Sequence, residues 1–303
     1  MPTQTATIRQ TGDIASRVSQ NLYRYKRISL GLLASQFALT LLVFATGTAQ
    51  AANAPTLGQT STYGVVSTTF TNANTAPQTI INGSVCYTIP PGTPPLSVTG
   101  LTVTPCPAQV GLDQNAALAQ LNGQPCVSLG AGAVALDGVI VGANPPGTIP
   151  PGCYSSGGAM NVTVGTTVTL TGNGVYVFRP GGALTTGANS RVILAGGACA
   201  SDVYWAPGGA TSLGANAALS LTPTFVGNIW GAADITIGHF ANLTGRALAF
   251  GGTVTTDAVT VTVPSCAAFG SQSQGIPTLG EWAMVLLASL LGFAGFAAIR
   301  RRR

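Results

Sequence analysis

The sequence predicts an all-β fold in which short strands stack in successive coils, and three observations support this. A seven-residue phrase recurs five times between residues 161 and 263, with starts 22, 27, 24 and 19 residues apart. Short runs in which β-branched residues alternate with small ones end in Gly-Gly or Pro-Gly pairs. Helix signals are almost absent from the middle of the chain. Repeats of about 20 to 30 residues are typical of solenoids, whose coils bury their inner faces on their neighbours.

Each copy of the phrase has a hydroxyl-bearing side chain at its third position. These residues are Thr163, Thr185, Ser212, Thr236 and Thr255, and the candidate row extends to Thr167, Thr186, Asn189 and Asn216. Because stacked strands lie about 4.8 Å apart, one position repeated in every coil makes a straight row. We therefore expect the function to lie on a regular surface and not in a cleft. Such ladders also stabilise solenoids from within, and alternation allows some of these hydroxyls to point inward.

One short helix is expected over residues 112–121, with Asp113 as its cap and an apolar stripe that packs on the stack. Residues 84–110 hold two cysteines and six prolines and fit no repeat. We interpret them as an irregular cap or insertion that protects an open end of the stack. The solenoid domain is expected over residues 52–269, followed by a polar linker at 270–275.

The net charge of +5 belongs to the two ends of the chain. Between residues 52 and 275 three arginines face five aspartates, for a net charge of −2, which argues against nucleic-acid binding. At the N-terminus a basic stretch ends at Arg27, an apolar run covers 28–45, and Ala49-Gln50-Ala51 is the pattern a signal peptidase accepts. Residues 1–51 are therefore predicted to be a signal peptide; an uncleaved anchor is the alternative.

Cysteine usage agrees with export, because all six cysteines fall in the part predicted to be exported. The sequence alone does not choose among the possible pairings. We favour pairs of chain neighbours, which are Cys86 with Cys106, Cys126 with Cys153, and Cys199 with Cys266.

The C-terminus combines Ile276, Pro277, Thr278, Leu279 and Trp282 with an uncharged span at 283–299 and four terminal arginines. A membrane helix with a cytoplasmic end is predicted. The order of these features in residues 276–303 resembles the IPTL-type sorting signals that exosortase-like enzymes handle in Gram-negative bacteria. Ala283 departs from that pattern, in which Gly usually follows the Trp. The resemblance implies attachment to the cell envelope, at least transiently, and such an enzyme as a partner.

The solenoid part resembles a known family. The phrases Val-Tyr-Val-Phe-Arg-Pro-Gly-Gly from Val175, Asp-Val-Tyr-Trp from Asp202 and Gly-Arg-Ala-Leu-Ala from Gly245 are similar to those of bacterial and fungal ice-binding proteins of the DUF3494 type. The resemblance runs from about residue 151 to 266 and is looser from 63 to 153. It implies a right-handed β-solenoid of triangular section with one helix along its side. It also implies ice as the partner, although fold alone does not establish function.

We expect an exported, surface-anchored protein that binds ice through a flat Thr/Ser/Asn face. The alternative is a structural or adhesive surface solenoid that binds polysaccharide or other cells. Catalysis is not expected, because the five acids are scattered and His239 has no nucleophile or second carboxylate at a useful spacing. We interpret His239 as a turn or surface residue and Arg246 as structural. No metal-ligand spacing or cofactor motif is present in the sequence.

Overall fold

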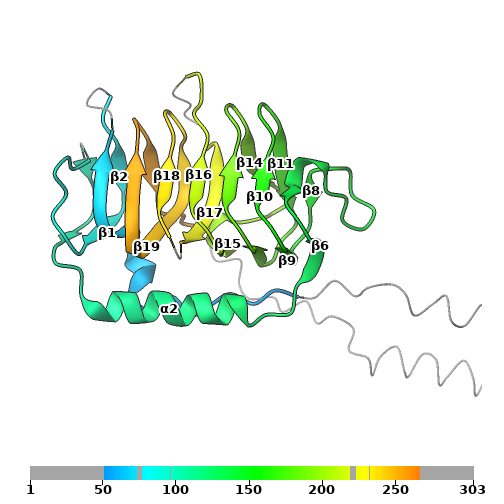
Figure 1. The fold of residues 1–303 in the computed structure, drawn as a ribbon, viewed down its shortest axis with the longest axis horizontal. Helices are drawn as coiled ribbons and strands as arrows, with labels where there is room; N and C mark the ends of the chain where they lie inside the picture. The colour runs from blue at the N-terminus through cyan, green and yellow to red at the C-terminus, as the bar shows by residue number, and fades with distance from the viewer. Residues whose placement is uncertain (1–50, 74–76, 96, 219–222, 232, 267–303) are drawn as a thin grey trace, which may run out of the picture. The chain divides into compact units, whose positions relative to one another are not determined.

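The computed structural model describes residues 51–266, except for 74–76, 96, 219–222 and 232. Here the chain forms a β-solenoid with one α-helix alongside (Figure 1). All strand pairings in these residues are parallel. The fold class expected from the repeat is confirmed. The predicted signal and membrane helices lie outside the described residues, and no described helix is long and apolar enough to cross a membrane.

Three stacks of strands make three faces. Face a contains β6 (Val127–Gly130), β9 (Gly152–Ser156), β12 (Tyr176–Pro180), β15 (Val203–Trp205), β17 (Phe225–Trp230), the first half of β19 (Leu243–Thr256), the first half of β1 (Tyr63–Asn72), β3 (Ser84–Tyr87) and β5 (Thr102–Val103). Face b contains β7 (Val134–Ala135), β10 (Met160–Val162), β13 (Leu184–Thr186), β16 (Thr211–Leu213), β18 (Ile235–Ile237) and the second halves of β19 and β1. Face c contains β8 (Thr148–Ile149), β11 (Thr167–Thr171), β14 (Arg191–Ala195), the first residues of β17 and β19, β20 (Thr260–Thr262), β2 (Ile80–Asn82) and β4 (Ser97–Val98).

The order of the coils in space differs from their order in the chain. The first coils, from β1 to β5, run outward to one end of the stack. Helix α2 (Ala108–Asn122) then crosses to the other end, where β6 begins the second run of coils (Figure 1). This run ends at β19 and β20, which pair with β1 and β2. The last coil of the chain therefore closes against the first.

Apolar side chains fill the interior between the three faces. An aromatic ladder connects neighbouring coils, with the ring centroids of Phe178 and Trp205 4.2 Å apart and those of Trp205 and Phe225 5.0 Å apart. The Trp205 indole donates to the Val226 carbonyl oxygen at 2.9 Å, so its one polar atom is satisfied in the core. Stacked rings of this kind hold successive coils in register.

Helix α2 packs on the outer side of face a. Its buried residues Val110, Ala117 and Leu121 belong to a cluster that also contains Tyr204 and Trp230. The helix begins earlier than expected, with Pro107 at its N-cap, so the prediction that Asp113 caps it is wrong. Asp113 instead accepts the Gln59 backbone N–H at 2.8 Å, and this bond lowers its pKa.

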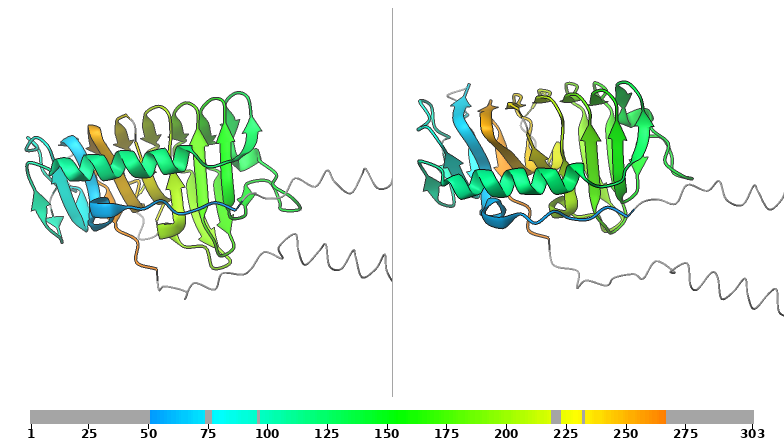
Figure 2. Two further views of the ribbon diagram at one scale, coloured as in Figure 1. Left: turned by 90° about the horizontal axis from the view of Figure 1, so that it is seen from below. Right: turned by 60° about the horizontal axis from the view of Figure 1, so that its bottom comes forward.

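An N-terminal strap, residues 52–57, runs beside the helix (Figure 2). The Gln120 side chain accepts the Thr56 backbone N–H, and Gln124 exchanges two hydrogen bonds with the Asn53 backbone. A short 3-10 turn, η2 (Gly58–Thr62), then leads into β1. The strap and the helix together cover face a.

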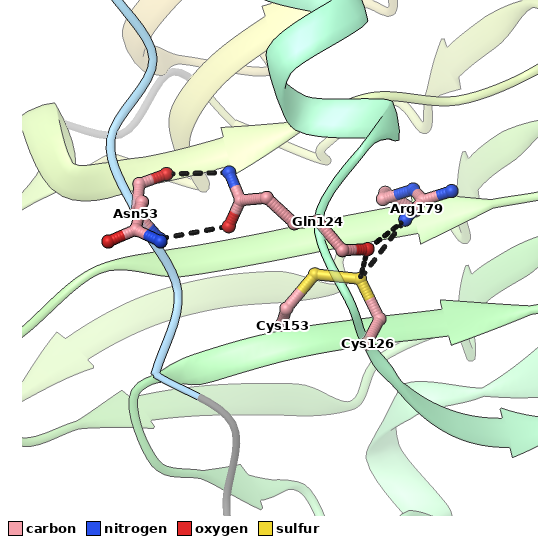
Figure 3. The surroundings of a disulfide bond; sticks show 5 residues. All are labelled: Asn53, Gln124, Cys126, Cys153 and Arg179. Carbon is pink, nitrogen blue, oxygen red and sulfur yellow. Dashed lines mark hydrogen bonds between the residues drawn. A yellow bond between two sulfur atoms is a disulfide. The ribbon is translucent and has the colours of Figure 1, made fainter.

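Three disulfides cross-link the coils, Cys86 to Cys106, Cys126 to Cys153 and Cys199 to Cys266, which are the pairs of chain neighbours expected above. Two of them fasten α2. Cys106 precedes the helix and joins it to β3, whereas Cys126 follows it and joins it to β9. Arg179 donates to the Gln124 carbonyl oxygen at 2.7 Å beside the second bond (Figure 3). The helix is thus fixed near both ends of the stack.

Residues 84–110 end the stack, as expected for a cap, but they are not irregular throughout. They contribute β3 and β4, which continue faces a and c by pairing with β1 and β2, and β5, which pairs with β3. The short strands were missed because the prolines and cysteines between them hide their alternation. Two further 3-10 turns, η3 (Leu136–Gly138) and η4 (Ala200–Asp202), connect strands elsewhere.

Candidate functional site

Face b presents a straight file of outward side chains, polar in every member but the first, which we call the central file. Its members occupy adjacent register positions on seven neighbouring coils and continue to a bridge with Thr93. They are Ala135, Asn161, Thr185, Ser212, Thr236, Thr255, Thr71 and Thr93. The strand residues on either side of each member point inward. Ile235 and Ile237 flank Thr236, for example, and both are fully buried while Thr236 is exposed.

A second file lies two residues earlier on each strand, and we call it the alanine file. It contains Ala133, Ala159, Ala183, Ala210, Asp234, Thr253 and Thr69. The two files are about 6.7 Å apart along each strand, and neighbouring members of one file are about 4.8 Å apart. Small side chains in both files make this part of face b flat.

Glycines flank the two files because a side chain there would collide with the next coil. A Cβ on Gly181 would lie 2.7 Å from the Gly157 carbonyl oxygen, and one on Gly208 would lie 2.7 Å from that of Gly181. On the other side, a Cβ on Gly214 would lie 2.5 Å from the Gly187 carbonyl oxygen. The glycines therefore allow the coils to approach closely at both edges of the face, which explains the Gly-Gly pairs and the glycine inside the repeat.

The structure brings four predicted site residues together and separates the others. Thr185, Ser212, Thr236 and Thr255 are consecutive members of the central file. Thr163 is not a member, because Asn161 pairs with Thr185 and Thr163 lies two residues beyond. The first copy of the phrase is shifted by one pleat, and the Thr163 hydroxyl donates to Asp137 Oδ1 at 3.0 Å.

The remaining predicted residues lie elsewhere. Thr167 is on β11 of face c, in register with Arg191. Thr186 shares the register of the buried Val162, and its hydroxyl accepts the Gly214 N–H at 2.9 Å. Asn189 and Asn216 hold the turn between faces b and c, where they bond to Ala217 and Phe240 of the next coil. All four residues lie outside the central file, and Thr186, Asn189 and Asn216 bond to the next coil.

Sequence reasoning missed Asn161, the members contributed by the first coil, Thr69 and Thr71, and Thr93 on the coil beyond it. The repeat in the sequence begins at residue 161, whereas the first coil joins face b only because the last coil closes against it. The Thr-x-Thr alternation at 69–71 was the available signal.

His239 has a carboxylate partner that the sequence did not reveal. Its Nδ1 lies 2.9 Å from Oδ1 of Asp257 on the next coil, with both side chains about one-third exposed. No nucleophile bonds to the His239 ring among the described residues, and no group of three or more potential metal ligands occurs there. His239 lies in a turn and is partly exposed, as expected, and the pair ties two coils together beside face b.

Arg246 lies on face a beside the turn η2, away from both files. Its guanidinium donates to Asn228 Oδ1 at 2.8 Å and to the Ser61 carbonyl oxygen at 2.9 Å. Burial lowers its pKa, and the neighbouring Tyr204 acts in the opposite direction. These contacts give Arg246 the structural role expected for it.

The chain matches known family models along most of its length. The model of the Ice-binding-like family matches residues 43–262, and an IPTL-CTERM motif matches residues 274–303. The chain belongs to the Ice-binding-like family. It is similar to the ice-binding protein of Nostoc sp. (strain HG1), with 31% identity over 217 residues that cover 69% of this chain and 74% of that protein.

Two further relatives match this Ice-binding-like protein over less than half of their own length. Ice-binding protein 1 of Shewanella frigidimarina is 35% identical over 120 residues, and the ice-binding protein of Flavobacterium frigoris is 32% identical over 117. The matches span 38% and 39% of this chain, but 13% and 40% of those proteins. Among solved structures, the ice-binding protein of Antarctomyces psychrotrophicus has a TM-score of 0.59 and 28% identity, covering 71% of this chain and all 100% of that one.

Proposed function

We propose that this protein binds ice through face b, with the central file as the row that holds water in an ice-like order. The observation that carries the proposal is the register: Asn161, Thr185, Ser212, Thr236, Thr255 and Thr71 follow one another on six adjacent coils of a flat face. The names of the relatives, which are ice-binding proteins, support the same function.

The chemistry of these side chains suits an ordered solvent lattice. A threonine hydroxyl anchors a water molecule, and its methyl group limits the disorder of the neighbouring waters. The threonine χ1 angle is restricted by β-branching, so little side-chain entropy is lost when water orders. The hydroxyls of Thr185, Ser212, Thr236, Thr255 and Thr71 make no hydrogen bond within the described part of the chain. They are therefore free to bind water.

The same proposal includes export and attachment to the cell envelope. The IPTL-CTERM motif at 274–303 and the terminal arginines support sorting at the surface of a Gram-negative bacterium, with an exosortase-like enzyme as a processing partner. The disulfides support an oxidising compartment outside the cytoplasm. Attachment would present face b to ice near the cell or limit recrystallisation there.

The test compares one face with another. The exported protein, purified with its disulfides intact, should produce thermal hysteresis and inhibit ice recrystallisation. Thr185→Arg combined with Ser212→Arg should abolish both, because two long cations disturb the centre of the file. Thr169→Arg on face c is the matched control and should leave activity unchanged. An inactive wild-type protein would contradict ice binding and favour adhesion to polysaccharide.

A further inference from the structure

Face b is not uniform, because its two halves carry different side chains. On the coils of β7, β10, β13 and β16 the alanine file holds four alanines, Ala133, Ala159, Ala183 and Ala210. Where the last coil meets the first, the same positions are Thr253 and Thr69, which pair with each other. With Thr255 and Thr71 they form a two-by-two array of threonines, which we call the threonine array.

The threonine array has a rigid base. Phe70 and Val254, which lie between its members on the two strands, are buried in the core. At the adjoining turn, the buried Thr79 hydroxyl lies 2.9 Å from the Thr256 hydroxyl and 3.2 Å from Asn72 Oδ1. This network joins β1 and β19 although their residues are about 180 positions apart.

Asp234 stands between the two halves. It follows Ala210 and precedes Thr253 in the alanine file, and it is the charged member of that file. Its side chain is exposed, and its Oδ1 accepts the Thr253 backbone N–H at 2.7 Å. This hydrogen bond holds the carboxylate beside the threonine array, where it cannot turn away without losing the bond.

A carboxylate at this place opposes the chemistry of the rest of the face. Removing an unpaired charge from water is far more costly than removing a hydroxyl or a methyl group. Waters around the carboxylate point their hydrogens at it and do not take the orientation that the neighbouring hydroxyls favour. Ice that contacts the alanine half therefore meets a charged break before it reaches the threonine array.

We propose that Asp234 is the residue that limits the ice-binding surface, because its carboxylate divides face b into an alanine half and a threonine array that do not act as one contact. The inference rests on the proposed function and adds a determinant of its strength. It requires that the loss of one negative charge at position 234 strengthens ice binding, whereas most substitutions on a binding face weaken it.

Asp234→Asn tests this in the full chain, since Asn keeps an oxygen that can accept the Thr253 N–H and removes the charge. Thermal hysteresis at equal protein concentration should rise about twofold or more relative to wild type. Asp137→Asn is the matched control. Asp137 carries the same charge and also accepts a backbone N–H, from Thr163 at 2.9 Å, but it lies outside both files at the end of the stack. This variant should match wild type.

The outcomes separate the two proposals. An active wild type with an Asp234→Asn variant that is equal or weaker overturns the role of Asp234 and leaves ice binding by face b intact. A similar rise in both variants also overturns it, because the effect would then come from net charge. If neither wild type nor variant affects ice, both proposals fail. Circular dichroism melting of each variant should show that folding is unchanged, and Asp234→Ala provides a second neutral side chain, matched to Ala210.

Discussion

Gly158 and Gly132 offer a direct test of why this solenoid needs glycine at the edge of face b. They belong to one column, because the Gly158 N–H donates to the Gly132 carbonyl oxygen on the preceding coil. A Cβ on Gly158 would lie 2.7 Å from the Ala133 nitrogen and 2.7 Å from the Gly132 carbonyl carbon. A Cβ on Gly132, at the end of the stack, would meet nothing within 4 Å.

The cost of Gly158→Ala follows from these distances. The added carbon falls about 0.7 Å short of the 3.4 Å at which ordinary contact begins, and its neighbours are backbone atoms that cannot rotate away. Overpacking of this kind costs about 1–3 kcal/mol. The alanine also reduces the entropy of the unfolded chain, which offsets about 0.4–1 kcal/mol. We expect a net loss of about 1–2 kcal/mol, because the first two coils must separate.

Urea unfolding followed by circular dichroism, with the disulfides kept oxidised, measures this difference. Gly132→Ala should be as stable as wild type or up to about 1 kcal/mol more stable, since only the unfolded-state term remains. Equal stability of the two variants would refute the idea that coil spacing excludes Cβ atoms from the column. An ice assay on Gly158→Ala should also show reduced activity, because the adjacent Ala159 belongs to face b.

Two further predictions concern stability. Burial raises the pKa of Asp202, and the Ser201 hydrogen bond acts in the opposite direction. The stabilisation that Asp202 contributes to the folded state is therefore present below the pKa of the unfolded chain and is lost as the pH rises through the pKa of the folded chain. Asp202→Asn should therefore raise the melting temperature at about pH 7 and not at about pH 3; an equal gain at both would contradict this. Replacing Cys126 and Cys153 together with serine should lower the free energy of unfolding by about 3 kcal/mol and expose helix α2 to proteases. An unchanged urea midpoint and proteolysis rate would show that the helix needs no fastening.

Much of the fold was predictable because each coil repeats a local pattern. The alternation around Thr185, Ser212 and Thr236 sets which side chains point outward, and the glycines that follow mark the turns. Spacing within the sequence predicted the wrong register for the first copy of the repeat, which is shifted by two residues along its strand. Asn161 and Thr163 are both polar and two residues apart, so the sequence offered two registers, and only pairing with Thr185 chose Asn161.

The amino-acid sequence by itself determined the strand stack, the low net charge of the solenoid and the hydroxyl of each repeat, because these depend on residue types and on their spacing over a few positions. Only the tertiary structure decided which hydroxyls share a face. Closure of the last coil on the first adds Thr71 to the central file and Thr69 to the alanine file, which completes the threonine array beside Asp234. Pairing of the consecutive strands β18 and β19 brings His239 to Asp257. The physical reason is that parallel pairing between distant coils fixes register through backbone hydrogen bonds and core packing, neither of which is written in the local pattern.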